Sequence, residues 1–183
     1  MGNGRITGTV TEKGSGLPLS NVEVKLERST RSGENAKTYP TIIESTVTDE
    51  NGSFALPFQM KLRYKYRVYT EPAEHSPAGE YLSEKKEKID LIVSPFGYIE
   101  IHLHKTSNLA TEYAELNVDH SNVVVLNVPN YPFDRIQGVY KVRAADNVGV
   151  YWTQRYNSNQ YKEGVKQLYV AKGDTVVCDV NLE

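Results

Sequence analysis

Short stretches in which apolar and polar residues alternate recur along the whole chain. Alternation of this kind places the apolar side chains on one face and is typical of half-buried β-strands. Clear examples are Val22–Leu26, Ile89–Val93 and Ile99–Leu103. Glycine, proline, asparagine and serine residues that favour turns separate these stretches. We find no convincing amphipathic helix, so the pattern predicts an all-β fold.

We expect about a dozen short strands, because the alternating stretches recur at a regular spacing. They lie at residues 4–11, 22–27, 41–48, 53–58, 62–69, 88–93, 98–104, 114–118, 123–128, 139–144, 148–156, 165–170 and 175–182. The polar stretches 71–88 and 157–164 are predicted to be loops. Three turns, at residues 49–52, 145–147 and 172–174, are predicted to close hairpins between consecutive strands. Short strands joined in this way are typical of an antiparallel β-sandwich.

The alternating pattern is interrupted near the middle of the chain, at Ser94-Pro95-Phe96-Gly97. The chain has 183 residues, whereas one sandwich domain typically holds about 100. We therefore place a domain boundary at this interruption. The prediction is two consecutive antiparallel β-sandwich domains, residues 1–94 and residues 95–183.

The turn at Asp49-Glu50-Asn51-Gly52 fits two different hairpins. A two-residue Asn51-Gly52 loop places Val47 opposite Leu56. A type I turn that begins at Asp49, with Gly52 in the left-handed conformation, places Thr46 opposite Leu56. The apolar pattern favours the first register and the turn chemistry favours the second, so the register of this hairpin stays open.

Charge and cysteine content narrow the classes of protein that fit. The net charge of −2 does not suggest a polyphosphate partner, so we expect no nucleic-acid partner. The single cysteine, Cys178, alternates with Val176 and Val180 and is predicted to be buried. No apolar run approaches the ~20 residues of a transmembrane helix, and the polar start of the chain is unlike a signal peptide. We therefore expect no transmembrane segment in this chain.

Three motifs follow one another in the first half of the chain. They are Gly8-x-Val10, then Gly16-Leu17-Pro18-Leu19-Ser20-Asn21-Val22-x-Val24, then Thr48-Asp49-x-Asn51-Gly52-x-Phe54. In this order they resemble the carboxypeptidase regulatory-like domain of the transthyretin-like (prealbumin-like) superfamily. The resemblance covers residues 4–93 and implies that the first domain is a transthyretin-like sandwich.

The second half of the chain resembles the second half of surface lipoproteins that are common in Bacteroidetes. The resemblance lies in the layout of Tyr98–Leu103 and Lys172–Val176. It implies an immunoglobulin-like or similar second sandwich and an extracytoplasmic chain, lipid-anchored to the cell envelope or secreted.

Two histidines are candidates for a binding surface. His102 and His104 are two residues apart on one predicted strand, so their side chains share a face with Tyr98 and Glu100. Imidazoles at this spacing can share a zinc ion if a third ligand comes from elsewhere. A solvated or interdomain strand face explains the same pattern without a metal. We take the second interpretation and expect neither a metal nor another cofactor.

Aromatic residues near residues 151–161 form the second candidate surface. Trp152 is predicted to face inward with Val150, which leaves Tyr151 on the outer face. Tyr156 and Tyr161 belong to, or lie beside, a predicted loop at one end of the sandwich. Because loops at sandwich ends often bind ligands, Tyr151, Tyr156 and Tyr161 are candidate contacts for a glycan or a protein.

Sequence signatures of enzymes are missing. The chain contains no Gly-x-Ser-x-Gly, no His-Glu-x-x-His and no phosphate-binding glycine loop. We therefore predict a non-enzymatic binding or structural module that contacts a protein or glycan at the cell surface. A small-ligand carrier of transthyretin type is the alternative hypothesis, and an undetected hydrolase is the third. Exposed edge strands would also allow two chains to pair as a homodimer.

Overall fold

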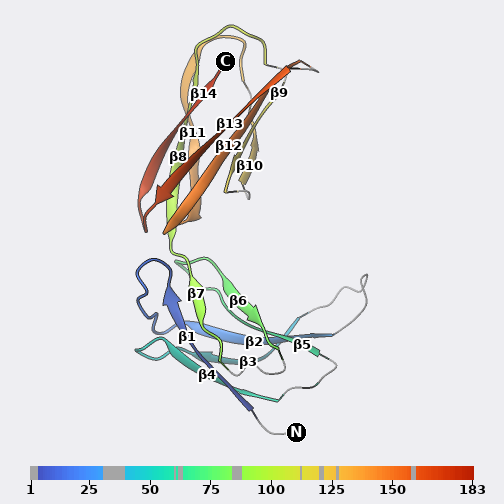
Figure 1. Ribbon diagram of the computed structural model, residues 1–183, viewed down its shortest axis with the longest axis vertical. Helices are drawn as coiled ribbons and strands as arrows, with labels where there is room; N and C mark the ends of the chain where they lie inside the picture. Colours follow the sequence, from blue (N-terminus) through green and yellow to red (C-terminus); the bar gives the residue numbers. More distant parts are fainter. Residues whose placement is uncertain are drawn as a thin grey trace. The chain divides into compact units, whose positions relative to one another are not determined.

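The computed structural model describes residues 4–30, 40–59, 61, 64–83, 88–111, 113–119, 122–126, 128–157 and 160–183. Within these ranges the chain forms strands β1 to β14 and no helix, as Figure 1 shows. Among the described residues, no helix has the length and apolar character needed to span a membrane. The chain divides into two compact units, Met1–Ser94 and Pro95–Glu183. The all-β prediction is confirmed.

The first unit is a sandwich of two sheets. Its strands are β1 (Gly4–Glu12), β2 (Glu23–Thr30), β3 (Thr41–Val47), β4 (Ser53–Phe58), β5 (Tyr64–Thr70), β6 (Ala78–Tyr81) and β7 (Leu91–Val93). One sheet has the order β4-β1-β7 and the other β3-β2-β5-β6. The apolar sides of the alternating strands meet between them in one core, formed by Ile6, Val10, Val24, Leu26, Phe54, Leu56, Tyr66, Val68, Ile89, Leu91 and Val93.

The second unit is built in the same way. Its strands are β8 (Phe96–Lys105), β9 (Tyr113–Val118), β10 (Asn122–Val125), β11 (Phe133–Arg143), β12 (Asp146–Asn157), β13 (Gln160–Val170) and β14 (Thr175–Leu182). The sheets have the orders β11-β8-β14 and β10-β9-β12-β13. Their shared core includes Ile99, Ile101, Leu103, Leu116, Val118, Val148, Val150, Cys178, Val180 and Leu182, so the predicted burial of Cys178 is confirmed.

Both units are therefore β-sandwiches, but neither is wholly antiparallel. In the first unit β7 runs parallel to β1, with Val10 paired to Leu91. In the second unit β14 runs parallel to β8, with Cys178 paired to Ile101. The expectation of antiparallel sheets missed these two pairs, because alternation along a strand carries no information on the direction of its neighbour.

The three turns that were predicted to close hairpins instead connect opposite sheets. The turn at 49–52 joins β3 to β4, the turn at 145–147 joins β11 to β12, and the turn at 172–174 joins β13 to β14. In each case the two strands belong to different sheets of their sandwich. The hairpin predictions are therefore wrong. Each turn reverses the chain across the core, so the apolar faces of the joined strands face one another.

The turn at Asp49 has the local chemistry of the type I alternative. The Asp49 carboxylate accepts hydrogen bonds from the backbone N–H groups of Asn51 (2.9 Å) and Ser53 (2.8 Å). Gly52 has a φ of 69°, which favours glycine. Neither predicted register exists beyond the turn, because β3 pairs with β2 and β4 pairs with β1. Val47 is accordingly exposed rather than packed beside Leu56.

Two predicted loops contain strand. Strand β6 lies inside the stretch 71–88 and pairs with β5, for example through Gly79 and Tyr69. Strand β13 begins at Gln160 and forms a true hairpin with β12, so that Tyr161 pairs with Arg155. Both segments are rich in polar residues because much of each strand is exposed, and that composition resembles a loop.

Candidate functional site

The candidate site is the outer face of the β11-β8-β14 sheet, which is the side turned away from the core. Along β8, Ile99, Ile101 and Leu103 are buried, so the intervening side chains lie on the outer face. Paired residues on neighbouring strands place their side chains on the same side of a sheet. The resulting cross-strand rows are Lys141–Tyr98–Thr175, Val139–Glu100–Val177, Ile136–His102–Asp179 and Asp134–His104–Asn181.

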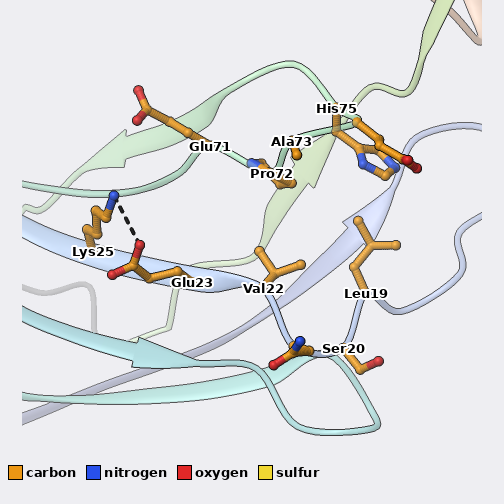
Figure 2. Close-up of a pocket in the computed structure, with 11 residues that line it drawn as sticks. Leu19, Ser20, Val22, Glu23, Lys25, Glu71, Pro72, Ala73 and His75 are labelled. Atoms are coloured by element: carbon orange, nitrogen blue, oxygen red, sulfur yellow. Dashed lines mark ion pairs between the residues drawn. The ribbon is translucent and has the colours of Figure 1, made fainter.

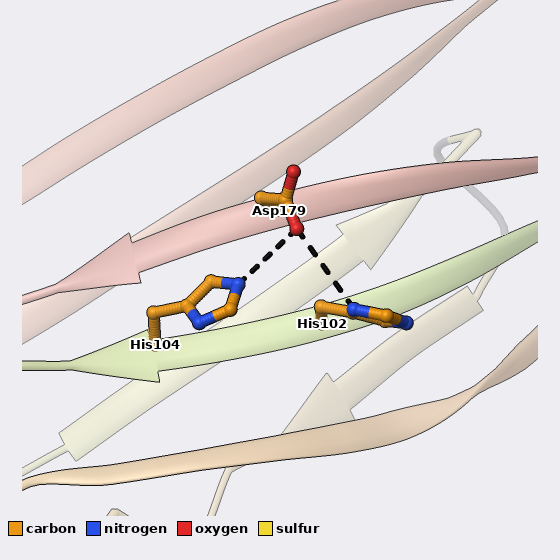
Figure 3. Close-up of side chains that lie close together, drawn as sticks. All are labelled: His102, His104 and Asp179. Atoms are coloured by element: carbon orange, nitrogen blue, oxygen red, sulfur yellow. Dashed lines mark hydrogen bonds and ion pairs between the residues drawn. The ribbon is translucent and has the colours of Figure 1, made fainter.

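Both histidines of β8 turn toward one carboxylate on β14, as Figure 3 shows. The Nε2 atom of His104 lies 3.1 Å from Oδ1 of Asp179. The Nδ1 atom of His102 lies 3.9 Å from the same oxygen. One donor atom from each of the three residues lies within 4.8 Å of the other two. The structure therefore assembles a His–His–Asp cluster on adjacent strands.

Each histidine also meets a second carboxylate through its other ring nitrogen. The Nε2 atom of His102 lies 2.6 Å from Oε1 of Glu100. The Nδ1 atom of His104 lies 3.2 Å from Oδ2 of Asp134. Because a carboxylate only accepts, it favours an N–H on the nitrogen that faces it. These contacts orient both rings on the strand.

The carboxylates change the protonation of the cluster. The hydrogen bond to Asp179, together with the charge of Asp134, raises the pKa of His104 above its ordinary value of 6.5. In return the hydrogen bond from His104 lowers the pKa of the Asp179 carboxyl below 3.8. The two carboxylates therefore favour the protonated form of His104.

An apolar area lies beside this cluster on the same outer face. Val139 and Val177 flank Glu100 in one row and are 55% and 48% exposed. Ile136 and Tyr98, from the rows on either side, are also exposed. The outer face thus combines aliphatic and aromatic side chains with two imidazoles and three carboxylates.

The structure places the remaining predicted tyrosines away from this face. Tyr151 lies on β12 in the opposite sheet and lines a hollow of about 330 Å³ with Trp152 and Val165. Tyr156 and Tyr161 line a second hollow, of about 610 Å³, near the β12–β13 turn. The predicted site residues therefore form two separate groups, with Tyr98, Glu100, His102 and His104 together and the three tyrosines apart from them.

Two carboxylates of the site, those of Asp179 and Asp134, were not predicted from the sequence. The outward direction of Asp179 follows from the alternation of Val176, Cys178 and Val180, which face inward. Its position beside His102, however, depends on the parallel pairing of β14 with β8. Asp134 lies in a segment that was not predicted to be strand, and no local signal links it to His104.

The first unit carries a hollow of about 490 Å³, shown in Figure 2. Its lining includes Glu23, Lys25 and His75, and Glu23 pairs with Lys25 at 3.1 Å. The ring of His75 is held by the buried carboxylate of Glu12 at 2.8 Å. Leu19, Val22, Pro72 and Ala73 also line the hollow, so charged and apolar side chains are mixed there. No sequence motif pointed to these residues.

Comparisons with known proteins place the chain in no family. No family model matches the sequence, and none of the curated proteins is similar to it. Among solved structures, the shaft pilin SpaA of Lactobacillus rhamnosus GG has a TM-score of 0.43 and 10% identity, with 98% of this chain and 97% of that chain covered. The minor pilin of Streptococcus agalactiae has a TM-score of 0.37 and 11% identity, with 96% and 94% covered. Since both scores lie below 0.5, we derive the function from the residues of this chain alone.

Proposed function

We propose that this chain is a non-enzymatic extracytoplasmic module that binds a protein through the outer face of its β11-β8-β14 sheet. The observation that carries the proposal is the exposed apolar group on that face. Val139 and Val177 lie on either side of Glu100, with Ile136 and Tyr98 in the adjoining rows. Exposed apolar side chains interspersed with charged groups are a common feature of protein-contact surfaces.

The contacts of His75 support a structural role for that residue. Within the described parts of the chain, His75, His102 and His104 each contact at least one carboxylate. At His75 the same carboxylate, that of Glu12, also accepts a hydrogen bond from the Ser15 hydroxyl. A general base needs a ring nitrogen within reach of the proton that it removes, and the contacts of His75 instead tie together segments of the fold.

The setting of the module rests on the family resemblances of the sequence. They support a transthyretin-like first domain of carboxypeptidase regulatory type, residues 1–94, and a second sandwich, residues 95–183. They also support a lipid-anchored or secreted chain. A test is protease treatment of intact cells that make the protein, with an antibody against the chain as readout. Loss of the full-length band without lysis is expected, and complete protection would exclude the cell surface.

Binding can be tested with a pair of variants and a matched control. The fluorescently labelled chain is applied to the cells that make it, and saturable binding is measured. V139D/V177D places two charges in the apolar area and is expected to reduce binding at least tenfold. V165D is the control, because Val165 is 55% exposed on the opposite sheet. Equal binding by both variants, or no saturable binding by the unaltered chain, would contradict the proposal.

A glycan is the second candidate ligand, and the hollow beside Tyr156 and Tyr161 favours it. Aromatic rings offer flat apolar faces, and the neighbouring Gln160, Lys162 and Glu183 supply polar groups. A glycan array tests this alternative with the intact chain and with Y161A. Binding that Y161A abolishes would support the glycan. An array without signal would remove this candidate.

Pairing of two chains through edge strands belongs to the same proposal. Strand β3 is an edge of its sheet and exposes Ile42 and Val47. Such edges present unpaired backbone groups to a second chain, and a lysine on the edge opposes that pairing. Sedimentation velocity is expected to show a dimer that I42K converts to monomer. A monomer at every concentration of the unaltered chain would exclude this pairing.

A further inference from the structure

We propose that His102, His104 and Asp179 form a binding site for one divalent transition-metal ion, with zinc as the reference metal. Two imidazoles and one carboxylate make a ligand set that zinc takes in proteins. The three side chains come from adjacent parallel strands, and Figure 3 shows both rings directed at the carboxylate. The inference is independent of the protein-contact surface proposed above.

The second carboxylates give both rings the orientation that metal ligation needs. A metal-bound histidine usually donates its other N–H to a carboxylate or carbonyl, which fixes the tautomer. Glu100 occupies that position for Nε2 of His102, and Asp134 occupies it for Nδ1 of His104. The nitrogens that remain, Nδ1 of His102 and Nε2 of His104, are the two that lie toward Asp179.

The charge around the cluster favours a cation. With an N–H directed at Glu100, the Nδ1 atom of His102 presents a lone pair to Asp179 at 3.9 Å. Two hydrogen-bond acceptors that face each other do not attract unless a proton or a metal ion lies between them. Three carboxylates, those of Glu100, Asp134 and Asp179, contact only two imidazoles. Lys166 also lies near, since its ammonium group donates to the backbone carbonyl of Asp179, but it cannot occupy the space between the ring nitrogens and the carboxylate as a bound ion would.

The geometry requires only a small adjustment. Zinc binds nitrogen and oxygen at about 2.1 Å, so tetrahedral ligands lie about 3.4 Å apart. The His104–Asp179 and His102–Asp179 donor pairs lie at 3.1 and 3.9 Å, and all three donors lie within 4.8 Å of one another. The Asp179 side chain is 54% exposed, which leaves it room to rotate toward the two ring nitrogens.

The site has three protein ligands on an exposed sheet face, so the fourth zinc position is left to water or another ligand. Copper(II) is expected to bind more tightly than zinc, because sites built from nitrogen and oxygen ligands generally have a higher affinity for copper(II) than for zinc. Magnesium and calcium prefer an oxygen-only ligand set and are expected not to compete. The sequence alone led us to expect a strand face without metal, because the third ligand is recognisable only from the strand pairing.

Calorimetric titration tests the site with the full chain, free of any polyhistidine tag, and zinc chloride as the probe. One zinc ion per chain is expected. D179N keeps the size of the side chain but removes the charged ligand, and it is expected to weaken binding at least tenfold. D134N alters only the partner of His104, and it is expected to weaken binding about 10–100-fold. D174N is the matched control, since Asp174 is exposed but lies outside the cluster, and it is expected to bind like the unaltered chain.

Nuclear magnetic resonance identifies the ligand atoms without any substitution. Long-range proton–nitrogen spectra are expected to show zinc-induced shifts at Nδ1 of His102 and at Nε2 of His104. No saturable heat with the unaltered chain would overturn the proposal. Binding by D179N that equals that of D174N, or coordination through the opposite nitrogens, would overturn it as well.

Discussion

The Nε2 atom of His104 lies 3.1 Å from Oδ1 of Asp179, although the two residues are 75 positions apart in the chain. The contact exists because β14 runs parallel to β8. It links β14, the last strand of the second unit, to β8, the first strand of the same unit. Asp134 contacts His104 from β11, on the other side of β8.

The contact predicts a change in the titration of His104. Its pKa is raised in the folded chain, so its stabilising effect is present below the unfolded value of 6.5 and is lost as pH rises through the folded pKa. The pKa of Asp179 is lowered, so its effect is lost as pH falls through its own folded value. D179N is therefore expected to lower the pKa of His104, measured by proton–carbon spectra of the ring with a chelator present. D174N is the control, and a His104 titration that D179N leaves unchanged would refute the assignment.

The strands of both sandwiches were largely predictable, whereas their connections were not. Alternation identified Ile99, Ile101 and Leu103 as inward residues because burial acts on each strand separately. The turn at Asp49–Gly52 was predicted from its own residues, and its local chemistry is present. Whether the flanking strands pair or cross to opposite sheets depends on distant contacts, and a short turn permits both.

Thr48 provides one of those distant contacts. Its hydroxyl donates to the carbonyl of Leu19 at 2.7 Å and accepts from the N–H of Val22 at 2.9 Å. T48V keeps the shape but leaves both backbone groups without this partner, and it is expected to lower the free energy of unfolding by about 1–3 kcal/mol. Urea denaturation measures the change. T41V, at an exposed position of β3, is expected to have little effect. Equal stability of the two variants would show that the Thr48 hydroxyl does not stabilise the connection from β3 to β4 in the opposite sheet.

Gly164 and Trp152 are paired on β13 and β12. A methyl group at position 164 would overlap the Trp152 ring, so G164A must displace the indole from the core that it packs against. We expect a loss of about 1–3 kcal/mol of unfolding free energy. A shift in fluorescence is also expected, since this is the single tryptophan. G138A is the control, because its methyl group would meet no atom closer than 3.4 Å. If G164A leaves both stability and fluorescence unchanged, the close packing of the Trp152 ring against Gly164 is contradicted.

Lys105 is 2% exposed, and its ammonium group donates to the carbonyls of Leu109 at 2.6 Å and Pro129 at 2.7 Å. K105M keeps most of the volume but removes both donors, and it is expected to cost about 1–3 kcal/mol in unfolding free energy.

The pKa of Lys105 also predicts a dependence on pH. Burial lowers this pKa below 10.5, so the unfolded chain binds more protons between the folded value and 10.5. The stability of the unaltered chain relative to K105M is therefore expected to rise with pH across that window. Urea denaturation at a series of alkaline pH values measures the difference in unfolding free energy between the two chains. A difference that stays constant with pH would contradict the lowered pKa of Lys105.

The part of the candidate site that lies on β8 was visible in the sequence. The spacing of Tyr98, Glu100, His102 and His104 predicted a shared face, because side chains on one strand repeat every two residues. Asp134 and Asp179 come from strands whose pairing partners are far away in the chain. Tyr156 and Tyr161 line one hollow, but nothing in their spacing indicated that they lie apart from the histidines.

The most direct test of a functional outer face is site-specific photo-cross-linking on living cells. A photoreactive amino acid replaces Val177 on the outer face, or Val165 on the opposite sheet as the control, and cross-linked products are identified by mass. A discrete protein adduct from position 177 that is missing from position 165 is the predicted result. No adduct from position 177, or the same adducts from both positions, would contradict the assignment of this face as the binding surface.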